Sequence, residues 1–481
     1  MNLALAVRLG GWLLIALAAC QVVPLLAALA FDEPVLPYLG VAASGLLLGL
    51  PAALLVRPES LRIRPRDGFV VVSGAWAVAA SFGALPYVAT GALGPIDALF
   101  ESTSGFTTTG STVLTDIESA PHGLLLWRSL TQWIGGMGIV VFTIALMPIL
   151  GIGGMQLFKA EVPGPVTEKI RPRVAQTARA LWAIYVGLTL LQWLALLLAG
   201  MGPFDALNHA FSTLSTGGFS TRNASIRSYA SPAIEWIVIV FMLLGGMNFV
   251  LHYRVITGRV RDVGRDAELR YFLVVVAASI AAVTLAVGFG ARDGSGSGPL
   301  RDVVFTVVSV VTTTGFSTAD FELWPSFAHV VLLALMVLGS MAGSTSGGVK
   351  SLRALLAVRA VRGTFEKAGH RNAVHPPVQY GGRPVPEEVI TSIWVFLAVY
   401  GLLAAAQTAS VAAAGYDLDT SLSAALTSLG NVGPGLGAIG PYDHFAHFPV
   451  FVKLGLVFCM LAGRLELFTL LVLLTPGFWR R

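Results

Sequence analysis

Long apolar stretches alternate with short polar ones along the whole chain. The first two apolar stretches cover residues 11–30 and 38–56. The others lie at about 69–91, 124–150, 179–200, 231–256, 269–290, 326–350, 387–414 and 447–475. A helix needs roughly 20 apolar residues to cross a bilayer. The pattern therefore predicts an all-α polytopic membrane protein with ten spans.

The composition supports this prediction. Hydrophobic residues make up 55% of the 481 residues and charged residues only 12%. A soluble protein carries about 25% charged residues, so a water-soluble fold is excluded. The two cysteines, Cys20 and Cys459, lie inside apolar stretches. They predict neither a disulfide framework nor a metal site.

Basic residues gather at alternate ends of the spans. The clusters lie at 57–66, 159–179, 254–270, 350–383 and Arg480–Arg481, whereas the opposite loops are acidic. Cytoplasmic loops of membrane proteins carry such an excess of Lys and Arg. The net charge of +5 therefore indicates membrane topology rather than a nucleic-acid partner, and both termini are predicted to be cytoplasmic.

The N-terminal segment allows two interpretations. Arg8, the apolar stretch 11–30 and the "ALA" at 28–30 resemble a signal peptide with its cleavage site. The second span at 38–56 and the basic loop after it instead favour a retained two-helix hairpin with both ends in the cytoplasm. We favour the hairpin.

Four short polar stretches, each between two spans, align on a glycine. They are "DALFESTSGFTTTGST" (97–112), "DALNHAFSTLSTGGFST" (205–221), "DVVFTVVSVVTTTGFST" (302–318) and "TSLSAALTSLGNVGPG" (420–435). Each predicts one unit of outer helix, re-entrant segment and inner helix, so the fold class is four pseudo-symmetric repeats around one pore, plus the hairpin. The predicted domains are the hairpin at 1–67, and repeats at 68–158, 159–258, 259–362 (with an intramembrane gating loop) and 363–481.

Each polar stretch has the properties of a pore loop. An Asp or Thr opens it and is expected to be the N-cap, a short helix follows, and Thr and Gly then break the pattern. Irregular backbone at membrane depth must be buried in protein or line a water-filled path. Carbonyls of such a backbone can replace the hydration shell of a monovalent cation. Close helix packing through small residues is the alternative, but four aligned copies favour a selectivity filter.

The predicted filter takes three residues from each repeat. They are Thr108, Thr109 and Gly110; Thr216, Gly217 and Gly218; Thr313, Thr314 and Gly315; and Asn431, Val432 and Gly433. The stretches contain no carboxylate cluster of the kind that a divalent cation prefers. The filter is therefore expected to hold a monovalent ion.

With its motifs "TTTG", "STGGF", "TTTGF" and "NVGPG", the chain resembles the Trk/Ktr/HKT superfamily of cation transporters, and its extra hairpin resembles the TrkH/TrkG branch. The resemblance implies potassium uptake across the bacterial inner membrane, with potassium as the ion at the filter residues and no cofactor in the chain. Gly110, where sodium-preferring relatives have Ser, favours potassium. The implied partners are membrane lipid, a second copy in a homodimer, and TrkA, a cytosolic nucleotide-binding regulatory subunit that would dock on the basic loops.

The resemblance also implies a gate. The stretch "LLALMVLGSMAGSTSGGVKSLR" (332–353) interrupts an apolar span with small and hydroxyl residues, and Arg464 lies inside another span. An intramembrane charge is costly and indicates function. The predicted gate residues are Gly343, Ser344, Thr345, Ser346, Gly347, Gly348, Lys350 and Arg464. A glycine kink with Arg464 paired to Glu466 is the alternative, and the role of Lys453, snorkelling outward or neutralising a carboxylate, stays open.

Two other functions would require residues that differ from those in this sequence. A symporter coupled to protons or sodium would need ionisable residues near the midplane of broken helices, where this chain has Thr and Gly. A membrane-embedded enzyme would need a catalytic constellation, and the "GLGAIG" at 435–440 follows no strand of a nucleotide-binding unit. The sequence therefore predicts a transporter rather than an enzyme, and His209 is expected to make local hydrogen bonds rather than to bind a ligand.

Overall fold

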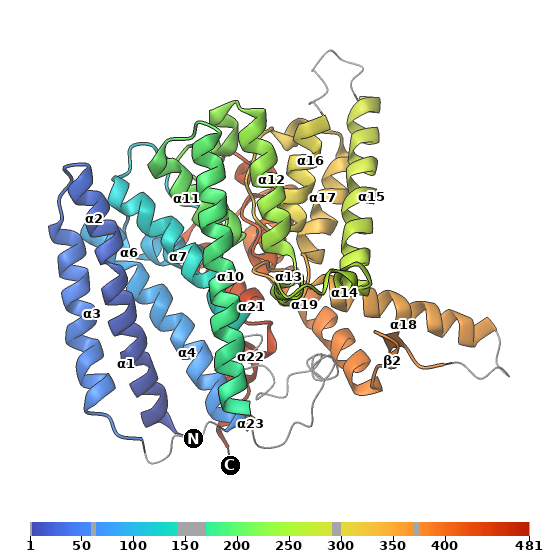
Figure 1. The fold of residues 1–481 in the computed structure, drawn as a ribbon, viewed down its shortest axis with the longest axis horizontal. Helices are drawn as coiled ribbons and strands as arrows, with labels where there is room; N and C mark the ends of the chain where they lie inside the picture. The colour runs from blue at the N-terminus through green and yellow to red at the C-terminus, as the bar shows by residue number, and fades with distance from the viewer. Residues whose placement is uncertain (1, 59–63, 142–169, 291–299, 370–375, 481) are drawn as a thin grey trace.

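The structure is a computed structural model that describes residues 2–58, 64–141, 170–290, 300–369 and 376–480. It is built from helices, and within these ranges the only strands are β1 (Gln379–Tyr380) and β2 (Arg383–Pro384), which form a short antiparallel hairpin. Both ends of the chain lie at the same end of the helix bundle (Figure 1). An even number of spans requires this arrangement.

An N-terminal hairpin begins the fold. Helices α1 (Leu3–Cys20) and α2 (Val22–Ala30) form one long span, and α3 (Leu36–Leu54) returns beside it. Gly11 lies directly against the backbone of α3, and this close approach is what small residues permit in membrane helices. The predicted hairpin is therefore present as two packed spans.

Four repeats of outer helix, short helix and inner helix follow the hairpin. The outer helices are α4 (Pro65–Gly83), α10 (Ile170–Leu198), α15 (Ala267–Gly290) and α19 (Glu387–Ala413). The short pore helices are α6 (Pro95–Phe106), α11 (Pro203–Leu214), α16 (Leu300–Val311) and α20 (Leu418–Gly430). The inner elements begin with α7 (His122–Val141), α12 (Pro232–Gly246), α17 (Ser326–Leu338) and α21 (Val450–Arg464).

The pore helices are too short to cross a membrane. Three have 12 residues and α20 has 13. At 1.5 Å per residue they extend about 18–20 Å, whereas the hydrocarbon core is about 30 Å thick. Most side chains of the pore helices are buried. The outer helices instead expose apolar side chains, such as Leu198 (90% exposed) and Val274 (66% exposed). The apolar exterior fits lipid, and the pore helices form the buried centre.

The inner helices are less regular than the sequence predicts. The apolar stretches 231–256 and 447–475 are each predicted as one span, and both are bent in the structure. The first bends by 100° before α13 (Phe249–Ile256), and the second bends by 113° before α22 (Phe468–Leu471) and η6 (Val472–Leu474). The third inner helix ends at Leu338, and α18 (Ser351–Gly369) begins only after an irregular segment. The hydrophobic pattern gives no sign of these two bends. At the first of them, backbone hydrogen bonds from this irregular segment take the place of helical ones.

The number of spans depends on how these bent helices are counted. Among the described residues, six helices are long and apolar enough to cross a membrane, and up to eight if each bent pair is one span. The 20-residue α7 and the 13-residue α17 are not among these eight, so the predicted number of ten stays a prediction. The short elements α5 (Leu85–Ala89), α14 (Val260–Gly264), η2 (Ser225–Tyr229), η4 (Phe321–Leu323), η5 (Gly437–Ile439) and α23 (Pro476–Trp479) lie in the connections.

The expected N-caps of the pore helices are wrong. Asp97 and Asp205 are the third residues of their helices, and the caps are Gly94 and Gly202, each followed by a proline. Proline suits the first helical position because its missing N–H would be unpaired there anyway. Asp302 is likewise the third residue of α16. Asp205 and Asp302 instead accept hydrogen bonds from the loops that follow the filter, as described below.

Candidate ion-conduction site

Each pore helix ends in the same strained backbone conformation. The residue after the last helical turn has a positive φ, between 52° and 56°, in all four repeats. These residues are Thr108, Thr216, Thr313 and Asn431. A positive φ is unusual for β-branched threonine and costs of order 1–3 kcal/mol. Such strain persists where the surroundings enforce it, which is typical of functional sites.

One hydrogen bond repeats four times after this turn. In each repeat the next backbone amide donates to the carbonyl five residues earlier, at 2.8–2.9 Å. The pairs are Thr109 with Ser104, Gly217 with Ser212, Thr314 with Ser309, and Val432 with Thr427. This is the bond that closes a Schellman-type helix end. The four loops therefore leave their helices with equivalent geometry.

The four filter glycines form a closed ring. Their φ values lie between 79° and 110°, a region that glycine adopts easily and other residues do not. Each glycine lies against a carbonyl oxygen of the next repeat, and a side-chain carbon there would overlap that oxygen. The pairs are Gly110 with Gly217, Gly218 with Thr314, Gly315 with Val432, and Gly433 with Thr109. The ring runs through repeats 1, 2, 3 and 4 and returns to repeat 1.

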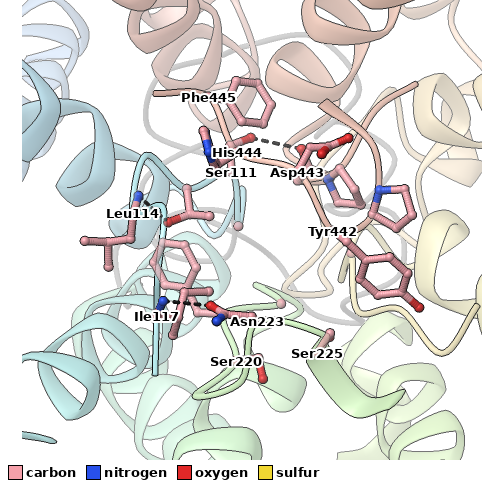
Figure 2. Close-up of a pocket in the computed structure, with 18 of the residues that line it drawn as sticks. Ser111, Leu114, Ile117, Ser220, Asn223, Ser225, Tyr442, Asp443, His444 and Phe445 are labelled. Atoms are coloured by element: carbon pink, nitrogen blue, oxygen red, sulfur yellow. Dashed lines mark hydrogen bonds between the residues drawn. The ribbon is translucent and has the colours of Figure 1, made fainter. Parts of the chain in front are cut away.

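A cavity opens onto this ring. All four filter glycines line it, together with residues of the polar loops that follow the filter. Figure 2 shows three of these loops around the opening, with Ser111 and Ile117 from repeat 1, Asn223 from repeat 2, and Asp443 from repeat 4. The four loops that the sequence aligns therefore meet at one opening, as the prediction of a common axis requires.

In repeats 2 and 3 the opening aspartate bonds the outgoing loop to the pore helix. Asp205 accepts a hydrogen bond from Thr221 Oγ1 at 2.7 Å, and Asp302 accepts one from Thr318 Oγ1 at 3.0 Å. In repeat 4, Thr420 takes this position, and its Oγ1 accepts from the backbone amide of Ala438 at 3.0 Å. The spacing of 13 residues between aspartate and glycine is thus the length of a helix plus the filter turn.

The predicted gate segment lies against the inner end of the filter. Gly347 N donates to Thr313 Oγ1 at 2.8 Å, and Thr216 Oγ1 donates to Thr345 Oγ1 at 3.2 Å. Thr345 Oγ1 donates in turn to the carbonyls of Leu214 and Gly245, both at 3.0 Å. Gly245 is next to the end of α12, so the segment occupies the break between α12 and α13.

Arg464 fastens this segment to another repeat. Its side chain is buried, Nη1 donates to Thr345 O at 2.7 Å, and Nη2 donates to Gly135 O at 3.0 Å. Glu466, the alternative partner, forms its ion pair with Arg353 instead. The guanidinium of Arg353 also stacks on the ring of Phe396 at 4.4 Å. The structure therefore joins Arg464 to the gate segment, as the sequence predicts.

Comparison with known proteins agrees with this arrangement. The family model described as "TrkH: Cation transport protein" matches residues 46–290 and 295–479. The chain belongs to the TrkH family. The resemblance that the repeated motifs indicate is thereby confirmed.

Members of the TrkH family from several bacteria are similar over most of this chain. A "Trk system potassium uptake protein TrkH" of Salmonella typhimurium is 43% identical over 88% of each chain. One of Halomonas elongata is 40% identical over 100% of each. The crystal structure of the potassium transporter TrkH from Vibrio parahaemolyticus has a TM-score of 0.91 at 36% identity and covers 100% of both chains. The chain is therefore an all-α, multi-span TrkH-type transporter and not an enzyme.

Sequence reasoning missed a buried ion pair behind the TrkH-family filter. Arg128 Nε and Glu101 Oε1 are 2.9 Å apart, and both side chains are at most 2% exposed. Arg128 also donates to Ser220 O at 3.2 Å and lies over the ring of Phe219 at 4.1 Å. The pair therefore joins repeat 1 to the outgoing loop of repeat 2. Both residues are charged and lie in apolar or pore segments. A charge inside such a segment is the signal that indicated Arg464, and it could have identified this pair as well.

Gln132 is a second missed residue. Its Nε2 donates to Gly217 O at 2.6 Å, and its Oε1 accepts from Phe219 N at 3.1 Å. The amide thus holds the backbone on both sides of Gly218. A single polar residue in an apolar span gives little sequence signal, because its role depends on a contact with a segment 85 residues away.

The remaining polar residues have structural partners. Lys453 Nζ lies 2.5 Å from Asp97 Oδ1, so Lys453 neutralises a carboxylate rather than snorkelling outward. His209 bonds Asp205 O at 2.7 Å and Ser220 Oγ at 3.0 Å, which are the local contacts that the sequence predicts. Lys350 is buried and its Nζ donates to Ser346 O within the gate segment.

The outer side of the site is acidic. Burial raises the pKa of Glu322, in the loop element η4, and the charges of Asp320 and Asp443 raise it further. Asp443 also lines the cavity above the filter. Carboxylates at the mouth of a pore attract cations, although salt in the medium screens this attraction.

Proposed function

We propose that this chain takes up potassium across the cytoplasmic membrane of a bacterium through a channel-like pore. The observation that carries the proposal is the closed ring in which each filter glycine touches a carbonyl of the next repeat. The relatives described above are named potassium uptake proteins. Potassium is then the substrate, and the chain needs no cofactor of its own.

The chemistry of the ring suits a monovalent cation. The carbonyls of Thr109, Gly217, Thr314 and Val432 replace water around the ion. The C-terminal ends of the four pore helices point toward the same region and carry partial negative charge. The proposed filter comprises these residues together with Thr108, Thr216, Thr313, Asn431 and the four glycines.

The membrane voltage is sufficient to drive uptake. A potential of 100 mV, negative inside, contributes about 2.3 kcal/mol per monovalent cation. Since about 1.4 kcal/mol corresponds to a tenfold concentration ratio, the voltage supports roughly 50-fold accumulation. The alternative is a symporter coupled to protons or sodium. Because the voltage alone is sufficient for uptake, the simple pore is favoured.

The gate is proposed to be the segment from Gly343 to Gly348, together with Lys350 and Arg464. The bonds of Thr345 and Gly347 to the filter loops support this role, because the segment crosses the inner end of the ring. Arg464 holds the segment through Thr345 O. Breaking these contacts would open the path to the cytoplasm.

The proposed setting is the inner membrane, with both termini in the cytoplasm and the chain in a homodimer. A cytosolic TrkA-type nucleotide-binding subunit would dock on the basic loops. Of these, 159–169 lies outside the described residues, while 254–270 and part of 350–383 lie within them. Arg254, Arg265, Arg270 and Arg359 line one open cavity beside β1. Asp262 and Asp266 also line it, so the net charge of its titratable side chains is positive by two. This excess of positive charge supports docking of an acidic surface.

Flux into proteoliposomes tests the proposal. Rubidium or potassium uptake should follow an imposed inside-negative voltage and should continue when the pH and sodium gradients are both collapsed. Uptake that follows the proton or sodium gradient instead would favour the symporter. No uptake of any cation under a voltage would contradict the proposal.

A further inference from the structure

The inner end of the filter carries a ring of side chains that is separate from the carbonyl ring. Thr108, Thr216, Thr313 and Asn431 occupy equivalent positions in the four repeats and are completely buried. Each supplies one side-chain oxygen, a hydroxyl in three repeats and an amide oxygen in the fourth. We refer to these four residues as the inner oxygen ring.

The gate segment occupies this inner oxygen ring. Gly347 N donates to Thr313 Oγ1 at 2.8 Å, and Thr216 Oγ1 donates to Thr345 Oγ1 at 3.2 Å. The Cα of Gly347 also lies beside Asn431, since a side-chain carbon there would be 3.0 Å from Asn431 Oδ1. Residues 345–347 therefore contact three of the four members of the ring.

Two oxygens of the ring have no hydrogen-bond partner among the described residues. They are Thr108 Oγ1 and Asn431 Oδ1, both in fully buried side chains. Native proteins satisfy most buried polar atoms, and an unpaired one destabilises the fold. Together with the hydroxyls of Thr216 and Thr313, these oxygens make a site for an oxygen-binding monovalent cation, because the ring contains no carboxylate.

We infer that the permeating cation and residues 345–347 of the gate segment compete for the inner oxygen ring. The inference rests on the proposed function, since it requires cations to pass through the filter. The amide hydrogen of Gly347 and a cation are both positively charged and both approach Thr313 Oγ1. Their mutual repulsion means that each weakens the binding of the other at that oxygen. A cation in the ring weakens the hold of the segment and favours the open gate.

The inference has a thermodynamic consequence. A ligand that binds one of two states shifts the equilibrium toward that state. Potassium binds the open arrangement, in which the ring is free, and Arg464 favours the closed one by holding Thr345 O. Potassium itself is then an activator of the gate, independent of any regulatory subunit.

Hydrogen exchange of the purified full chain tests the competition directly. Potassium chloride is titrated at constant ionic strength against N-methylglucamine chloride, and exchange is followed in peptides that contain Gly347. Exchange there should become roughly threefold to tenfold faster in potassium, which corresponds to the loss of one hydrogen bond. In Thr313→Val, exchange should be fast without potassium and should not respond to it. Thr313→Ser, which keeps the hydroxyl, should restore the response.

Two controls make the result decisive. Thr408→Val changes a threonine on α19 whose hydroxyl bonds only the carbonyl of its own helix at Ala404, and it should leave the response intact. If Thr313→Val does not fold, Thr216→Val removes the second contact and should reduce the response in the same direction. If hydrogen exchange at Gly347 in the unchanged chain does not respond to potassium, the inference is overturned. The proposed function fails separately, by an absence of rubidium flux.

Discussion

At the scale of single residues, the filter depends on two unusual backbone conformations placed two residues apart. Thr313 has a φ of 56° and Gly315 one of 81°. The positions of Thr and Gly could be predicted from the sequence because they recur in four aligned stretches. Glu101 and Arg128 could have been predicted as charges inside apolar or pore segments. Gln132 could not, because its role depends on a contact with a segment 85 residues away.

Replacing Gly315 with serine tests the filter at this scale. The new side chain would overlap Val432 O and strain the backbone, so the carbonyl should move away from the axis. We expect the potassium-to-sodium permeability ratio to fall roughly tenfold, a loss of about 1.4 kcal/mol of discrimination. Flux ratios measured with the two ions in proteoliposomes give the answer.

Gly401→Ser is the matched control for this change. Gly401 lies in α19 with no atom within 4 Å of the added carbon in the described part of the chain, so its permeability ratio should stay the same. An unchanged ratio in a folded Gly315→Ser protein would remove Gly315 from the filter.

At the scale of elements, the irregular segment between α17 and α18 explains features that the hydrophobic pattern could not predict. Met341 N bonds Gly246 O at 3.2 Å, and Phe249 N bonds Gly343 O at 3.1 Å. These contacts replace helical hydrogen bonds at the break between α12 and α13. Apolar content predicts where a span lies, but the break follows from a partner segment about 95 residues away in sequence.

Arg464→Ala tests whether this segment is held closed. The change removes charge-assisted hydrogen bonds to Thr345 and Gly135, each contributing about 1.5–3 kcal/mol. Basal rubidium flux without a regulatory subunit should rise tenfold or more, since about 1.4 kcal/mol is a tenfold change. Arg362→Ala, at an 81% exposed side chain on α18, should leave the flux unchanged. Equal or lower flux in a folded Arg464→Ala protein would count against the latch.

At the scale of the whole molecule, four equivalent loops meet at one axis although they lie about 100 residues apart. The sequence repeats predicted this architecture, and the TrkH-family match confirms the fold class. The boundaries of the domains and the orientation in the membrane stay predictions. They depend on charge placement in loops, part of which lies outside the described residues.

Regulation also belongs to this scale. Replacing Arg359, Arg362 and Lys367 with alanine removes positive charge from the basic cluster at 350–383 without touching the gate residues. The flux response to nucleotide in the presence of the regulatory subunit should decrease, because the acidic partner loses its attraction. The potassium-to-sodium ratio should not change. A changed ratio with an intact nucleotide response would contradict the docking proposal.

The most direct test of the account is to locate the ion. Crystals of the full chain grown in rubidium and measured at the rubidium absorption edge give an anomalous map of bound ions. We predict a peak on the axis within bonding distance of the carbonyls of Thr109, Gly217, Thr314 and Val432. An empty ring, with rubidium bound elsewhere in the protein, would contradict the claim that these four loops form the filter.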